Sequence, residues 1–97
     1  MATSYVIWDG PGVFDLMGSL FCDMPRRQVN FKIRGTNGDT VMWCEINSLE
    51  RVLCGDTWDF KGWQIHPDTI DWPNPRKLTG VTGRFSTRTR QGNIEVL

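Results

Sequence analysis

Apolar and polar residues alternate most clearly between positions 28 and 46, and this pattern predicts a β-hairpin. Val29, Phe31 and Ile33 are separated by single polar residues, which is the two-residue period of a strand with one buried face. Asn37-Gly38 is a favoured pair for a two-residue type I′ turn, so it is expected to form the loop. This loop sets a register with all the apolar side chains on one face, in the pairs Ile33–Met42, Phe31–Cys44 and Val29–Ile46.

A helical period follows the hairpin and predicts a short helix over residues 48–54. Asn47 is a suitable N-cap, and Glu50 lies three residues further on, as in a capping box. Leu49, Val52 and Leu53 would form the buried stripe of this helix. Gly55 would end it in a left-handed conformation.

The N-terminal region predicts a strand over 4–8 and a helix over 12–22. The apolar run Tyr5–Trp8 is closed by the turn residues Asp9-Gly10-Pro11-Gly12. After that turn, apolar residues recur at helical spacing. They are Val13, Leu16, Met17, Leu20 and Phe21.

Two further hairpins are expected in the C-terminal half, over 57–66 and 81–97. Lys61-Gly62 would be the loop of the first, with Phe60 opposite Trp63. Gln91-Gly92 would be the loop of the second. Closely spaced prolines between them predict an irregular loop over 67–80.

These elements together predict an α+β fold, in which a mostly antiparallel sheet of hairpins is accompanied by two short helices. The 97 residues are enough for a single small domain with its own core. No apolar run is long enough to span a membrane, and the first residues lack the basic region of a secretory signal. Cys22, Cys44 and Cys54 include no C-x-x-C pair, which favours reduced thiols and a cytoplasmic location.

The formal net charge is zero, so the chain lacks the overall attraction to nucleic acid that a basic protein has. Its charges are nevertheless unevenly distributed, because Arg84, Arg88 and Arg90 recur in the last hairpin. On one strand face these side chains would suit phosphates or carboxylates. The alternative is an edge strand that its charges keep from aggregating.

The polar face of the 28–46 hairpin is a second candidate surface, because it would carry Lys32, Arg34 and Trp43. Five tryptophans are many for a chain of this length. Trp58, Trp63 and Trp72 would either stack on a small ligand or carbohydrate, or contact a partner protein. The alternative for Trp58 and Trp63 is a role in the core of their hairpin.

Catalytic and metal-binding patterns are not evident in the sequence. Cys22, Cys44, Cys54 and His66 match no zinc-site spacing, and there is no phosphate-binding glycine motif. We therefore expect no cofactor, no metal and no enzymatic activity. The leading hypothesis is a small binding protein, an inhibitor or accessory subunit, that contacts a macromolecular partner. The alternatives are a nucleic-acid-binding module that uses the arginines with an exposed aromatic residue, and a ligand-binding protein that uses the tryptophans.

Overall fold

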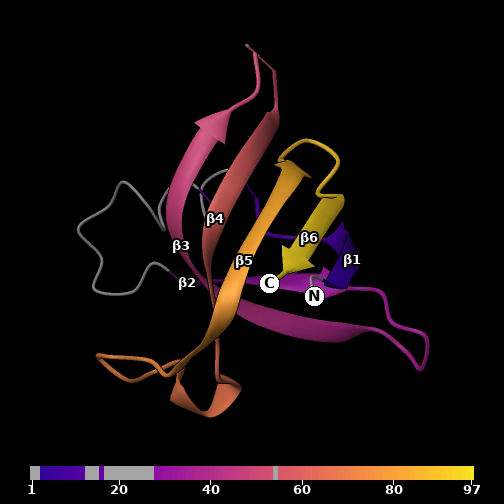
Figure 1. Ribbon diagram of the computed structural model, residues 1–97. Helices are drawn as coiled ribbons and strands as arrows, with labels where there is room; N and C mark the ends of the chain where they lie inside the picture. Colours follow the sequence, from indigo (N-terminus) through magenta and orange to yellow (C-terminus); the bar gives the residue numbers. More distant parts are fainter. Residues whose placement is uncertain (1–2, 13–15, 17–27, 54) are drawn as a thin grey trace.

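Six antiparallel strands form a closed barrel in the computed structural model, which describes residues 3–12, 16, 28–53 and 55–97 (Figure 1). A single turn of 3₁₀-helix, η1, lies between the fourth and fifth strands. The elements are β1 (Thr3–Asp9), β2 (Gln28–Ile33), β3 (Thr40–Arg51), β4 (Thr57–Ile65), η1 (Pro67–Thr69), β5 (Lys77–Ser86) and β6 (Gly92–Val96).

The barrel is an up-and-down meander, in which each strand pairs with the next along the chain and β1 pairs with β6. The closing pair runs from Thr3 opposite Val96 to Ile7 opposite Gly92. The two ends of the chain therefore lie on the same side of the barrel (Figure 1). Each strand has a partner on both sides, but β1 and β2 pair only at Ile7–Ile33 and Asp9–Lys32. Among the described residues, positions 28–31 of β2 and 46–51 of β3 therefore lack a partner strand on one side.

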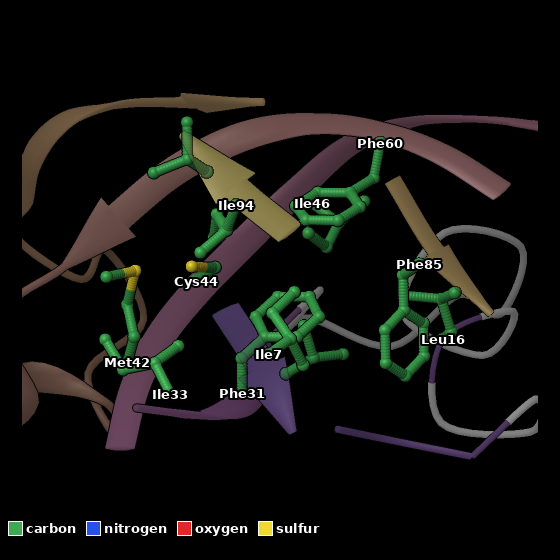
Figure 2. Close-up of a cluster of buried hydrophobic side chains, with 12 residues drawn as sticks. Ile7, Leu16, Phe31, Ile33, Met42, Cys44, Ile46, Phe60, Phe85 and Ile94 are labelled. Atoms are coloured by element: carbon green, nitrogen blue, oxygen red, sulfur yellow. The ribbon is translucent and has the colours of Figure 1, made fainter. Parts of the chain in front are cut away.

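Inward-facing side chains from every strand fill the interior (Figure 2). Phe31 stacks on Phe60 with 5.0 Å between ring centroids and meets Phe85 edge-on at 5.7 Å. The interior is therefore a packed core, as small barrels usually have. The buried cluster consists of Ile7, Leu16, Val29, Phe31, Ile33, Met42, Cys44, Ile46, Phe60, Val81, Phe85 and Ile94.

The predicted α+β class is wrong, because the chain folds almost entirely as sheet. The helix predicted over 48–54 is the end of β3, which continues to Arg51. A β-bulge between Ile46 and Ser48 shifts the alternation by one residue, so that Leu49 opposes Phe60 and packs against the core. The apolar spacing that resembles a helical stripe is therefore explained by the bulge in the strand. The residue with a positive φ after β3 is Leu53 and not the predicted Gly55.

The helix predicted over 12–22 lies largely outside the described residues. Of that range the structure describes Gly12 and Leu16 only. The Leu16 amide donates to the Gly12 carbonyl oxygen at 3.0 Å, and Leu16 is fully buried. Across the described part of the chain, no helix is long and apolar enough to cross a membrane.

The hairpin predicted over 57–66 is wrong, since these residues form one continuous strand, β4, between β3 and β5. Gly62 stands in the middle of this strand, opposite Ile46 and Val81. A Cβ at Gly62 would collide with the Glu45 carbonyl oxygen and lie 3.0 Å from the Ile46 Cα. Gly62 therefore permits close approach of β3 at its bulge and makes no turn.

The other two hairpins form with registers that differ from the predicted ones. In the first, Phe31 opposes Met42 and Val29 opposes Cys44, a shift of two residues that keeps the apolar side chains on one face. Its loop spans residues 34–39, and Gly38 alone in this loop has a positive φ, so the type I′ turn does not form. In the second, β5 begins at Lys77, within the predicted proline-rich loop, and residues 87–91 connect it to β6.

Candidate binding site

A β-bulge in β1 places Trp8 on the outer face of the barrel. Ile7 opposes Ile33 and Asp9 opposes Lys32, so Trp8 is the extra residue in β1. Ile7 on one side of it is fully buried in the core, whereas the Trp8 side chain is half-buried on the outside. Bulges of this kind re-aim side chains and are frequent beside functional sites.

Two cationic side chains lie over the Trp8 indole, from Lys32 in β2 and from Arg34, the first residue of the loop after β2. The Lys32 Nζ is 5.6 Å from the ring centroid, and the Arg34 Cζ is 5.4 Å from it. Both side chains are exposed and point outward, because Lys32 lies between the buried Phe31 and Ile33, and Arg34 directly follows Ile33 at the start of the loop. Each contact has the geometry of a cation–π interaction, and together they hold the two cations in place around one aromatic ring.

Exposed apolar side chains flank this arrangement on both neighbouring strands. Val6 of β1 is 50% exposed, and Val41 of β3, which pairs with Lys32, is 53% exposed. Trp43 follows on the same face of β3, because Met42 and Cys44 on either side of it point into the core. We call this outer face the Trp8 surface. It consists of Val6, Trp8, Lys32, Arg34, Val41 and Trp43.

Two depressions border the Trp8 surface. A recess of about 370 Å³ lies beside Lys32 and Trp43. Its described lining is Asp9, Gly10, Pro11, Gln28, Val29, Asn30, Lys32, Trp43 and Arg90. A hollow of about 550 Å³ lies beside Trp8 and Arg34. Its described lining is Val6, Ile7, Trp8, Arg34, Gln91, Gly92 and Asn93.

Positive charge predominates around these depressions. Their described lining contains three cationic side chains, Lys32, Arg34 and Arg90, and a single carboxylate, Asp9. Asp9 lies 3.1 Å from the Lys32 Nζ and 3.5 Å from the Arg90 Nε. Within the described part of the chain, Arg34 has no carboxylate within 4.0 Å. Among the described residues, the site therefore carries more positive charge than Asp9 balances.

Two buried N–H donors at the site lack an acceptor among the described residues. They are the Trp8 indole Nε1 and the Gln28 side-chain Nε2, and both atoms are shielded from solvent. Buried donors in native proteins are usually hydrogen-bonded, and an unsatisfied one costs about 1–3 kcal/mol. The exposed cations suit a ligand rich in negative charge, whereas the two buried donors lie out of reach of a ligand on the surface.

The three arginines predicted from the last hairpin are placed apart. Arg90 lies in the β5–β6 connection and lines the recess with Lys32 and Trp43. Arg88, in the same connection, lies 3.5 Å from an Asp56 carboxylate oxygen. Arg84 points outward from β5, where it lines a groove of about 520 Å³ whose described lining carries charges of both signs. Only Arg90 therefore extends the predicted Lys32, Arg34 and Trp43 surface.

Arg84 is paired with Asp59, directly across from it on β4. Its Nε and Nη2 donate to the two carboxylate oxygens at 2.8 and 3.2 Å. These hydrogen bonds hold the pKa of Asp59 below its ordinary value. A guanidinium that is already engaged in this bidentate manner is less available to a ligand than Arg34.

The three clustered tryptophans do not form one platform. Trp58 and Trp63 are five residues apart on β4, so they project to opposite faces of the sheet. Trp58 packs against the core, and Trp63 is 38% exposed beneath the Lys77 Nζ. Trp72, in the irregular segment before β5, is 55% exposed. Trp8 is the tryptophan that sequence reasoning missed. The one local signal for it is the turn pair Asp9-Gly10 directly after it, which marks the point where regular strand pairing ends.

The thiol predicted to be buried in β3 is buried. Cys44 is a free cysteine with no exposed surface, and burial raises the pKa of its thiol to about 12. Such a thiol is a poor nucleophile and a poor metal ligand. No group of three or more His, Cys, Asp or Glu side chains that could hold a metal ion occurs within residues 3–12, 16, 28–53 and 55–97.

A scan against protein-family models, a search of curated proteins and a search of solved structures each gave no match.

Proposed function

We propose that this barrel is a non-enzymatic binding protein that contacts a macromolecular partner through the Trp8 surface. The observation that carries the proposal is the bulge at Trp8, which sets an indole between Lys32 and Arg34 on the outside of the barrel. Trp and Arg are the residues that most often dominate the energy of protein interfaces. An inhibitor or an accessory subunit fits this role, and the free thiol of Cys44 favours a cytoplasmic location.

The packed interior supports an external site. Phe31, Phe60 and Phe85 occupy the middle of the barrel and are essentially unexposed, so their rings fill the space that a ligand-carrying barrel leaves open. The outer face of β1–β3, in contrast, presents apolar side chains and cations together. Charges alone would be sufficient to keep these strands soluble. The exposed apolar side chains beside them are therefore better explained by a binding surface.

A photocrosslinking experiment tests the proposal. Val41 is replaced by a benzophenone amino acid in the full chain, and the protein is exposed to an extract of its native cells. Thr82, on the outer face of β5 in the mixed-charge groove, is replaced in the matched control. We expect a discrete adduct from position 41 that is lost on adding Arg34→Glu and is absent from position 82. Equal labelling from both positions, or no adduct at position 41, contradicts the proposal.

Single-stranded nucleic acid is a second candidate partner, favoured by the composition of the recess. Trp43 lies there with the carboxamides of Gln28 and Asn30 and the cations Lys32 and Arg90. An indole stacks on bases, amides bond their edges, and cations neutralise phosphates. This candidate predicts binding of a labelled oligothymidine that weakens steeply with salt and fails in a Lys32→Ala/Arg90→Ala variant. Absence of binding at low salt removes it.

A further inference from the structure

The charges and exposed side chains of the Trp8 surface define the chemistry of its partner. Arg34 has no carboxylate partner in the described part of the chain, and Lys32 shares Asp9 with Arg90. A complementary ligand must therefore bring carboxylate or phosphate oxygens. A guanidinium fork binds either of these groups in a bidentate manner.

The same surface also requires an apolar component in its partner. Val6 and Val41 are both about half exposed and lie on the strands on either side of Lys32 and Arg34. Trp43 adds part of an indole to this apolar border. Covering these side chains removes apolar area from water, which favours binding. The ligand best suited to the surface is consequently both acidic and apolar.

Two observations favour a peptide over a single-stranded nucleic acid. The ring of Trp8 is already in contact with Lys32 and Arg34, which leaves Trp43 as the one indole of this surface for stacking, whereas single-stranded nucleic acids usually stack successive bases on several aromatic side chains. The chain also has zero formal net charge and therefore lacks the long-range attraction that favours phosphate backbones. Carboxylates of a peptide need no stacking platform, and its apolar side chains match Val6 and Val41.

We infer that the Trp8 surface docks a segment of a partner protein that carries both carboxylates and apolar side chains, with Arg34 as the main anchor for a carboxylate. This inference rests on the proposed function. Around Lys32, β2 is paired with β1 through Asp9 and with β3 through Val41, so a segment docked there cannot be added as a strand. Recognition therefore depends on the side chains of the Trp8 surface.

A selection from random peptides displayed on phage tests the inference without assuming a sequence. The full-length protein is the bait, and enriched peptides are synthesised with a fluorescent label for anisotropy titrations. We expect enrichment of Asp and Glu together with apolar residues. We also expect Arg34→Ala to weaken binding of these peptides roughly tenfold or more, as loss of a charge-assisted bidentate contact would. Arg84→Ala is the control, because it also removes an exposed arginine but from the outer face of β5, and it should leave the affinity unchanged.

Other outcomes overturn the inference. These are enriched peptides without acidic residues, peptides that bind Arg34→Ala as tightly as the unmodified protein, or a selection that enriches nothing. A labelled oligothymidine that binds more tightly than the peptides and competes with them would assign the surface to nucleic acid. The proposed function would survive that result, since the surface would still bind a macromolecule, and it fails only in the crosslinking experiment. Circular dichroism of each variant checks that the barrel is folded.

Discussion

Arg90 and Gly10 are joined by reciprocal hydrogen bonds across 80 positions of sequence. The Gly10 amide donates to the Arg90 carbonyl oxygen at 2.9 Å, and the Arg90 Nε donates to the Gly10 carbonyl oxygen at 2.7 Å. These bonds tie the β5–β6 connection to the segment that follows β1, next to the recess. The edge of the candidate site therefore depends on contacts that also hold one end of the barrel together.

Replacement of Gly10 by alanine should destabilise the protein. A Cβ at this position would lie 2.6 Å from the Phe85 Cζ and 3.2 Å from the Ile7 Cγ2, and both of those side chains are fully buried. Overpacking of a filled core typically costs about 1–3 kcal/mol in the free energy of unfolding. Urea denaturation measures this loss. Gly12→Ala is the matched control, because no atom of the described residues lies within 4 Å of its Cβ position, and it should leave stability almost unchanged.

Arg90 has a φ of 62°, so its backbone conformation and its side chain make separable contributions. Arg90→Ala removes the side-chain bond to Gly10 and the ion pair with Asp9 but keeps the left-handed backbone, which costs a non-glycine residue roughly 1–2 kcal/mol. Arg90→Gly loses the same contacts and relieves the backbone. We therefore expect Arg90→Ala to be less stable than Arg90→Gly by about 1 kcal/mol in urea titrations. Equal stability of the two variants would show that the backbone conformation carries no strain.

Asp59 should contribute to the loss of stability in acid. Its pKa is lowered from 3.8, chiefly because Arg84 donates hydrogen bonds to its carboxylate. A carboxyl group with a lowered pKa in the folded state stabilises the fold above its ordinary pKa, and this contribution disappears as the pH falls through the lowered value. Asp59→Asn cannot ionise, so its free energy of unfolding should fall less between neutral pH and pH values below 3.8. The difference is expected to be small, because the pair is exposed.

The Arg84→Gln variant provides an independent check on that pH dependence. It removes the guanidinium charge and the bidentate pair of donors, leaving only a neutral amide donor, so it should reduce the loss of stability in acid in the same direction as Asp59→Asn. A steeper acid limb in either variant would contradict the assignment.

Cys44 should resist alkylation in the folded protein. Its thiol is buried and has a pKa of about 12, so the reactive thiolate is scarce at neutral pH and sealed from the reagent. We expect iodoacetamide to leave the Cys44 peptide unmodified under native conditions and to modify it fully in guanidinium chloride. Peptide mass spectrometry distinguishes this cysteine from Cys22 and Cys54. Rapid native labelling at Cys44 would show that β3 opens far more often than a closed barrel permits.

The alternation of apolar and polar residues predicts which segments form strands and which side chains face the core, because these features depend on neighbouring residues. The alternation of Val29, Phe31 and Ile33 correctly predicts a strand and its buried face, because the inward side chains are the ones that fill the core. The same pattern allows a shift by two residues, since that shift keeps every side chain on its face. The structure therefore confirms the faces of the first hairpin and corrects its register.

The rest of the fold depends on pairing between distant strands, which a local pattern does not contain. Asn47 and Glu50 have capping-box spacing, yet β4 supplies a partner for this segment, and Leu49 reaches the core through a bulge. Lys61-Gly62 resembles a turn in the sequence, but Gly62 is required because the backbone of β3 passes close beside it. Of the candidate site, Lys32, Arg34 and Trp43 follow from alternation. Trp8 and Arg90 join them only through the β1 bulge and the β5–β6 connection.

Closure of the barrel through β1 and β6 has a consequence for folding during synthesis. Thr3 of β1 pairs with Val96 of β6. During synthesis β1 is made well before β6, so the edge of β1 that pairs with β6 stays uncovered until β6 has been made. In the nascent chain, β1 can pair with β2 alone and leaves an open edge that other chains could join. Contacts between residues so far apart in sequence also slow folding. The barrel that lacks β6 is therefore the form most prone to aggregation. Assistance by a chaperone would matter most before residues 92–96 are available.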